Sequence, residues 1–180
     1  MPRSSPGRAG VLLTLVLAGM SMLGPFSIDT PFPAFAQMRG DFGVGAEQMQ
    51  LVVSAYVLAF AVMARCRGRL SDGIGRKPVI IGALTAYAMA SVGCALSPNL
   101  SVLLFFRVLQ GLSAGGSTII GRTIIRDLFD GPEAQRMMSR VMMIFGLAPA
   151  VAPIIGGLLL RVGPWPAIFW FIGGFALLLG

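Results

Sequence analysis

Two charged residues stand inside long apolar stretches, and their types and surroundings could do chemistry. Asp29 lies in the stretch SIDTPFP (residues 27–33), and Arg107 begins the stretch RVLQG (residues 107–111). A charged side chain within a membrane span costs at least about 2.5 kcal/mol and usually faces a bundle interior or a water-filled path. A carboxylate there can bind and release a proton, which suits ion coupling, while an arginine there needs a carboxylate, carbonyl oxygens or water as its partner.

Other kinds of chemistry are disfavoured by what the sequence lacks. The chain has no His, and its two Cys residues, Cys66 and Cys94, do not have the spacing of metal ligands. It also contains no paired-carboxylate motif and no G-x-x-x-x-G-K-[ST] phosphate-binding loop. We therefore expect neither an enzyme nor a bound metal or cofactor.

The elements that would position these residues are membrane helices. Hydrophobic residues make up 56% of the 180-residue chain and charged residues only 12%, which is typical of a multi-span membrane protein. Each span must be helical, because a bilayer cannot satisfy exposed backbone groups. We predict an all-α fold with spans at Val11–Ala36, Gln50–Ala64, Val79–Leu96, Val102–Ile120, Val141–Leu160 and Pro166–Leu179.

The positive charges sort by connection, although the net charge of +7 could suggest nucleic-acid binding. Eleven of the 14 Lys and Arg residues lie in the amino-terminal tail and the second and fourth connections. Only Arg39 and Arg161 lie in the first and fifth connections, and the third has none. The sequence therefore predicts a cytoplasmic amino terminus and no nucleic-acid partner.

The place of Asp29 has two interpretations. Pro25 and Pro33 lie four residues to either side of it and would loosen the helical hydrogen bonds around a buried carboxylate. Alternatively, Pro31 and Pro33 end the helix early, and Asp29 is a solvated helix end at the outer interface. The first interpretation makes Asp29 a proton site.

The connection between the second and third spans carries the most specific pattern. Residues 68–78 read GRLSDGIGRKP, with glycines for a tight turn, an aspartate that can cap a helix and two cations for an anionic membrane surface. This resembles the signature loop of the major facilitator superfamily. The resemblance implies a latch between the two halves of a transporter, and it assigns to this latch Gly68, Asp72, Gly75, Arg76, Lys77 and Asp127.

The chain departs from the family pattern in this connection. The family usually has a basic residue where this chain has Gly73, and it has small or apolar residues at the positions of Arg65, Arg67 and Arg69. These three additional cations leave open whether the latch operates.

Two further stretches resemble exporters of this superfamily. Arg107, Gln110 and Gly111 match an R-x-x-Q-G pattern whose arginine is implicated in proton coupling, which makes Arg107 the expected counter-charge of Asp29. The alternative is an interfacial arginine whose side chain reaches outward. In the fifth span, an element similar to G-P-x-x-G-G comprises Pro149, Pro153, Gly156 and Gly157, although these residues would also suit a generic kinked helix.

The resemblance extends over nearly the whole chain and is strongest to drug/proton antiporters of the bicyclomycin-resistance (Bcr/CflA) type. It implies six transmembrane helices in two inverted three-helix repeats, forming the amino-terminal half (residues 1–180) of a twelve-helix fold whose carboxy-terminal half is absent. The implied function is proton-coupled efflux of small amphiphilic compounds across the bacterial inner membrane. Its partners are the lipid bilayer, substrate and proton, and the missing half or a second copy. The alternative is a non-transporting or inactive six-helix subunit that acts only through a partner or homodimer.

Overall fold

The computed structural model describes residues 8–74, 76–129 and 131–179, with the side chains at 8–14, 66–77, 117–124 and 126–128 left out of the description. The described chain is helical and contains no strand. Its elements are α1 (Arg8–Asp29), η1 (Phe32–Ala34), α2 (Phe35–Phe42), α3 (Ala46–Ile74), α4 (Arg76–Ala95), α5 (Leu100–Leu128), α6 (Gly131–Val162) and α7 (Pro166–Leu179). The prediction of an all-α chain with six long helices is confirmed.

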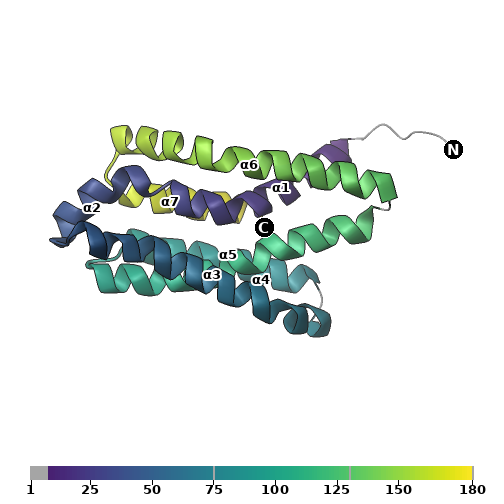
Figure 1. Cartoon of the computed structure of the whole chain (residues 1–180), viewed down its shortest axis with the longest axis horizontal. Coiled ribbons are helices and arrows are strands. Elements are labelled where there is room, and N and C mark those ends of the chain that lie inside the picture. The colour runs from purple at the N-terminus through teal and green to yellow at the C-terminus, as the bar shows by residue number, and fades with distance from the viewer. Residues whose placement is uncertain (1–7, 75, 130, 180) are drawn as a thin grey trace.

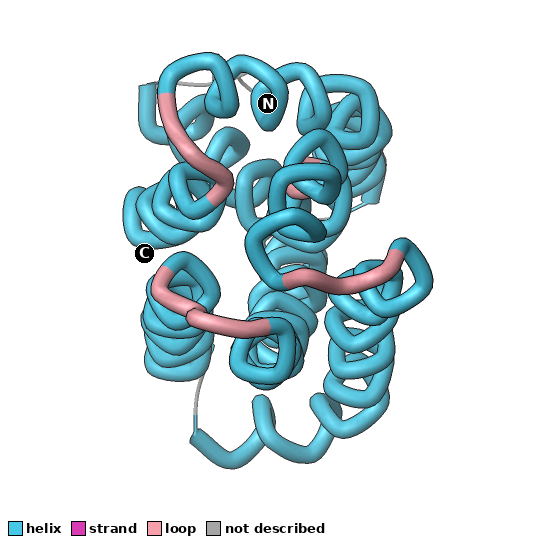
Figure 2. The backbone as a smooth tube through the Cα atoms, turned by 90° about the vertical axis from the view of Figure 1, so that its left-hand side faces the viewer, coloured by secondary structure: helices cyan, strands magenta, loops and turns pink. Residues whose placement is uncertain are grey.

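The six long helices run roughly lengthwise in one bundle (Figures 1 and 2). Helix α5 packs against both α3 and α4, and α4 also packs against α7. Helix α1 packs against α6 and α5, so it connects the α6 side of the bundle to the α3–α4–α5 side. Elements distant in the sequence thereby share one core.

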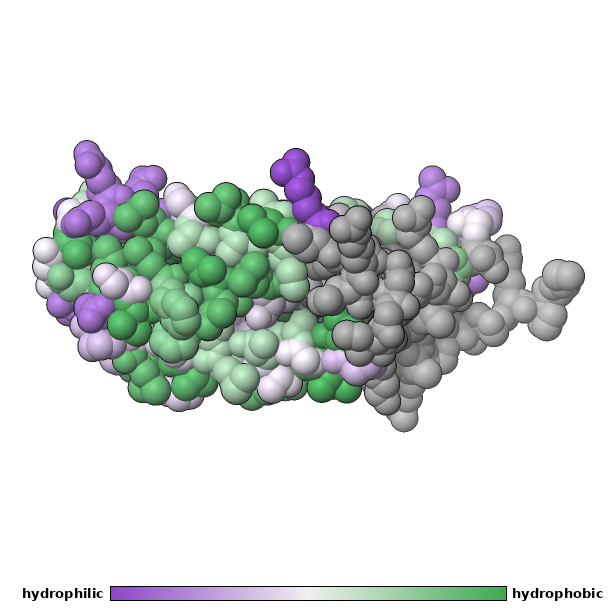
Figure 3. Space-filling model, turned by 90° about the horizontal axis from the view of Figure 1, so that it is seen from below, coloured by the Kyte–Doolittle hydropathy of each residue, from purple (hydrophilic) through white to green (hydrophobic). Residues whose placement is uncertain are grey.

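Several helices have the length and composition of membrane spans. Three helical segments within the described residues are long and apolar enough to cross a bilayer, namely Ala46–Arg65, Pro78–Ala95 and Gly131–Val162. Large apolar side chains such as Leu58, Met143 and Ile154 are exposed along the bundle. Figure 3 shows a broad hydrophobic surface on one face, as expected for side chains that contact lipid.

The first predicted span, Val11–Ala36, is wrong as a single helix. Helix α1 ends at Asp29, and the chain continues through η1 and then α2 to Phe42. Proline has no backbone N–H, so Pro31 and Pro33 cannot donate to the carbonyls four residues before them. The helix therefore stops where the alternative interpretation of Asp29 placed its end.

Helices α3 and α6 are longer than the hydrophobic segments that predicted them. Helix α3 continues to Ile74, so Gly68 lies within a helix rather than in a tight turn, and α4 begins at Arg76. Helix α6 begins ten residues before the predicted Val141, at Gly131. The apolar pattern marks only the part of each helix that suits lipid, because polar residues can continue a helix into water.

A cluster around Trp165 ties the α6–α7 turn to α2. The Trp165 indole Nε1–H donates to Asp41 Oδ2 at 2.8 Å, and its backbone N–H donates to Gln37 Oε1 at 3.0 Å. Its ring meets Phe42 edge-on, with 5.4 Å between centroids. These contacts hold α2 against the turn between α6 and α7.

Candidate functional site

Arg107 is the largest fully buried side chain in the described part of the protein. It lies in the third turn of α5, and its Nη1 donates to the Ser27 carbonyl at 2.9 Å and to Gln110 Oε1 at 3.0 Å. The alternative of an arginine that reaches outward is therefore wrong. Of the partners that the sequence allowed, a backbone carbonyl is the one observed.

The position of Arg107 suits the electrostatics of a helix end. Ser27 lies in the last turn of α1, where carbonyls have no partner within the helix and carry partial negative charge. A guanidinium at this end is therefore favourable, and it supplies a hydrogen bond that the helix lacks. Arg107 thus links α5 to the end of α1.

A chain of buried polar groups extends from Arg107 to α4. Gln110 Nε2 donates to Ser91 Oγ at 2.7 Å, and Ser91 Oγ donates to the Tyr87 carbonyl at 2.8 Å. The Tyr87 hydroxyl in turn bonds to the Ser27 side chain, which closes the network back onto α1. Each member fixes the orientation of its neighbour, so the network holds the guanidinium in one place.

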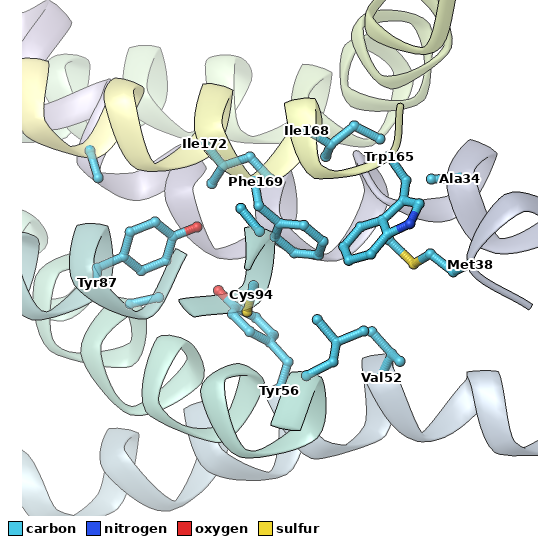
Figure 4. Packing of buried hydrophobic residues seen from close by; sticks show 14 of the residues in the cluster. Ala34, Met38, Val52, Tyr56, Tyr87, Cys94, Trp165, Ile168, Phe169 and Ile172 are labelled. Carbon is cyan, nitrogen blue, oxygen red and sulfur yellow. The ribbon is translucent and has the colours of Figure 1, made fainter. Parts of the chain in front are cut away.

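Aromatic rings complete the surroundings of the guanidinium. Its Cζ lies 5.0 Å from the Phe169 ring centroid and 5.5 Å from that of Tyr56. Figure 4 shows Tyr56, Tyr87 and Phe169 converging on one region from α3, α4 and α7. The remaining nitrogens, Nε and Nη2, are buried and have no hydrogen-bond partner among the described residues, so these rings provide much of what faces the charge.

Asp29 is not the direct partner of Arg107. It is the last residue of α1 and half-buried, and it forms no ion pair with Arg107. The expected counter-charge pairing is therefore wrong for this conformation. The backbone of α1 nevertheless places Asp29 only two residues after the carbonyl that Arg107 binds.

The side chains of the predicted latch lie outside the described part of the structure. The side chains of Asp72, Arg76, Lys77 and Asp127 lie outside the described residues, and so does Gly75 altogether. For Gly68 and these four charged residues the structure gives the backbone only. Gly68 and Asp72 lie in α3, Arg76 and Lys77 in α4, and Asp127 in α5. The latch remains a prediction.

The element in the fifth span lies beside the end of α1. Gly156 of α6 is buried, and a Cβ there would lie 2.1 Å from the Thr30 carbonyl oxygen. A Cβ on neighbouring Gly157 would meet nothing within 4 Å. Helix α6 continues through Pro149 and Pro153. The small size of Gly156 thus allows α6 to lie directly against the backbone that follows α1.

Gly111 of the R-x-x-Q-G pattern lies where α5 packs closely against α3. A Cβ on this residue would lie 2.4 Å from the Tyr56 carbonyl oxygen, so α5 and α3 approach closely at this level. The approach brings the Tyr56 ring to Arg107, one turn away along α5. Gln110 and Gly111 therefore act on two neighbouring helices from the same turn, one by hydrogen bonding to α4 and one by allowing close contact with α3.

Sequence reasoning missed four residues of this site. Tyr56, Tyr87, Ser91 and Phe169 belong to no motif, and only the fold brings them to Arg107. Ser27 did carry a readable signal, because Pro31 stands four residues after it and removes the usual helical donor to its carbonyl.

Comparisons with known proteins agree on one family. A family model described as the Major Facilitator Superfamily matches residues 11–180. The MFS-type transporter YdgK of Bacillus subtilis (strain 168), itself described as uncharacterized, is 34% identical over 183 residues, covering 99% of this chain and 46% of that protein. A bicyclomycin resistance protein homolog of Haemophilus influenzae is 34% identical over 166 residues, covering 89% of this chain and 40% of that protein. The chain thus spans about half the length of the relatives it matches, or slightly less.

A solved structure has the same arrangement of helices. It is a bacterial homolog of the human lysosomal transporter Spinster in an inward-facing and occupied conformation, with a TM-score of 0.79. The match covers 98% of this chain and 44% of that chain, at 21% identity. At this identity the likeness shows the fold alone.

Proposed function

The chain belongs to the major facilitator superfamily, and we propose that it forms one six-helix half of a proton-driven exporter of small, amphiphilic compounds. Curated relatives include proteins named for resistance to bicyclomycin, to chloramphenicol and to multiple drugs. The observation that carries the proposal is the full burial of Arg107. Its guanidinium donates to the carbonyl of Ser27, which lies two residues before Asp29 in α1. A charge so costly to bury is expected at a working site.

Asp29 is the proton-binding group of this proposal, and Arg107 tunes it. Asp29 lies two residues after Ser27, which is a member of the buried network. The two charges do not touch in this conformation, which leaves Asp29 free to exchange a proton. A small change at the end of α1 would bring them together or further apart.

The second half of the transport path comes from outside this chain. Superfamily members place the substrate site at the membrane midplane between two halves, each made of two inverted three-helix repeats. Residues 1–180 would supply one wall, and a carboxy-terminal half the other. The proposal therefore includes a partner domain of similar size, with the latch residues Asp72, Arg76 and Asp127 at the boundary.

The distribution of cations and the arrangement of the bundle support a proposed orientation. The start of α1, the α3–α4 reversal and the α5–α6 reversal lie toward the same end in Figure 1. These are the cation-rich segments of the sequence. We place this end in the cytoplasm of a bacterial cell, with the bundle in the inner membrane.

Efflux measurements test the proposal directly. The full-length transporter that contains these residues is expressed in a strain without its major pumps, and export of a preloaded fluorescent dye is followed after energisation. We expect efflux that a protonophore abolishes, and Arg107→Met is expected to reduce it to the level of the empty vector. Efflux equal to the vector control in the wild type, or undiminished by the protonophore, would contradict the proposal.

A further inference from the structure

The end of α1 contains a carbonyl that its own helix cannot satisfy. In a continuous α-helix the Ser27 carbonyl would accept from the backbone N–H of residue 31. Residue 31 is Pro31, which has no N–H. The preceding carbonyl, at Phe26, shows the ordinary pattern, since it accepts from the Thr30 N–H at 3.1 Å.

The backbone at this point would otherwise allow the helix to continue. Pro31 has φ −75° and ψ −13°, which is a right-handed helical conformation that alanine adopts readily. The missing donor at residue 31, rather than a distorted chain, is therefore what leaves the Ser27 carbonyl open. Pro31 itself is buried, so water does not supply the donor through an exposed surface at that residue.

Arg107 supplies the donor that the helix lacks. Its Nη1 lies 2.9 Å from the Ser27 carbonyl oxygen. This is one of only two hydrogen bonds of the guanidinium within the described part of the chain, because Nε and Nη2 have none. The Ser27 carbonyl and the Gln110 amide together therefore determine where the charge lies.

We propose that Pro31 is a positioning residue for Arg107, because it keeps the Ser27 carbonyl free to accept from the guanidinium. An N–H at residue 31 would compete for this carbonyl and release half of the hydrogen bonding that holds Arg107. The released guanidinium would be free to move along the end of α1 toward Asp29. The functional part of this inference rests on the proposed function of Arg107, while the structural part does not.

A double-mutant cycle on thermal stability tests the structural part without any transport. Arg107→Met is made in the wild-type transporter and in Pro31→Ala, and the unfolding temperature of each purified variant is measured in lipid nanodiscs. In the wild type this change leaves the Ser27 carbonyl buried without a donor, whereas the backbone N–H introduced by Pro31→Ala would supply one. The shift in unfolding temperature caused by Arg107→Met is measured in the wild type and in Pro31→Ala. We expect the shift in Pro31→Ala to be more favourable than the shift in the wild type by about 3 °C.

Pro33 offers the matched control for this cycle. Pro33→Ala would restore a donor to the Asp29 carbonyl, with which Arg107 forms no hydrogen bond. Arg107→Met should therefore have the same effect with and without Pro33→Ala. Equal effects of Arg107→Met in the wild type and in Pro31→Ala would overturn the inference, whatever the efflux results.

A backbone analogue separates the missing N–H from the stiffness of the proline ring. Nonsense suppression can place the α-hydroxy analogue of alanine at residue 31, which has a flexible backbone and no N–H. We expect Pro31→Ala to reduce proton-driven dye efflux severalfold and the α-hydroxy analogue to restore it. Failure of the analogue to restore efflux, with Pro31→Ala impaired and folded, would show that the ring is what matters. If Arg107→Met and Asp29→Asn leave efflux unchanged, the proposed function fails, and the thermal cycle alone decides the role of Pro31.

Discussion

At the scale of single residues, the buried guanidinium of Arg107 has no carboxylate partner within the described structure. Removing a charge from water costs several kcal/mol, and the Ser27 carbonyl and the Gln110 amide offset only part of this cost. The faces of Phe169 and Tyr56 contribute a further, smaller attraction. The arrangement is therefore costly to the fold, and we infer that a working role retains it.

Asp29 gives the first residue-scale prediction. Asp29→Asn keeps the size and shape of the side chain but removes its ability to bind and release a proton. In the full-length transporter we expect proton-driven efflux to fall to background while substrate binding, measured by fluorescence quenching, is retained. The reason is that Asp29 is the acidic group beside the buried network at the end of α1.

Glu47→Gln is the matched control for this change. Glu47 is an exposed acidic residue in the first turn of α3, and its neutralisation should leave efflux as in the wild type. Undiminished efflux from Asp29→Asn under a pH gradient would remove Asp29 from the mechanism. A loss in both variants would point to surface charge instead.

Much of this site could be anticipated from the sequence, but its contacts could not. An arginine and an aspartate in apolar stretches drew attention to Arg107 and Asp29, and the R-x-x-Q-G pattern identified Gln110. A direct ion pair between the two charges is not observed, because the guanidinium donates to the Ser27 carbonyl and to Gln110 instead. The tyrosines and Ser91 were out of reach, since α3 and α4 meet α5 only through tertiary packing.

At the scale of helices, two neighbouring glycines of α6 allow a matched test of packing. A Cβ on Gly156 would lie 2.1 Å from the Thr30 carbonyl oxygen, which is backbone and cannot turn away. Gly156→Ala should therefore destabilise the protein by about 1–3 kcal/mol. The measurement is the unfolding temperature of the purified transporter in nanodiscs.

Gly157→Ala is the internal comparison, because a Cβ there would meet nothing within 4 Å. Alanine also favours a helix over glycine, so this variant should be as stable as the wild type or slightly more stable. Similar destabilisation of both variants would mean that the α1–α6 contact does not depend on Gly156. The same contact adjoins the end of α1, so we also expect Gly156→Ala to impair efflux more than Gly157→Ala.

The helices themselves were easier to predict than their ends. Hydrophobic length located all six, and the last, Pro166–Leu179, was predicted with the bounds that the structure gives. The errors have two physical causes. Prolines removed backbone donors at the end of α1, and polar segments continued α3 to Ile74 and began α6 at Gly131, where hydropathy carries no signal.

At the scale of the whole molecule, the distribution of cations predicts which end of the bundle faces the cytoplasm. Single cysteines at Ser4 and Ser101, in a background without Cys66 and Cys94, report the two ends. Ser101 is exposed in the first turn of α5, so its cysteine is accessible to a reagent. We expect a membrane-impermeant maleimide to label Ser101→Cys in intact cells and Ser4→Cys only after lysis. The reverse pattern would invert the proposed topology.

Residues 1–180 expressed alone give the last prediction, which is that they do not transport. Alternating access requires two halves that move about a site between them, and one half offers a single wall with nothing to close against. Without a second bundle, the face at the end of α1 that carries Asp29 would meet lipid, which is costly for a charged group. We expect the 180-residue chain to insert into the membrane, to be degraded faster than the full-length transporter, and to leave dye efflux at the vector level.

Co-expression with a separate carboxy-terminal half should restore protein level and efflux together. Proton-dependent efflux from residues 1–180 alone would instead favour a homodimer, in which a second copy supplies the missing wall.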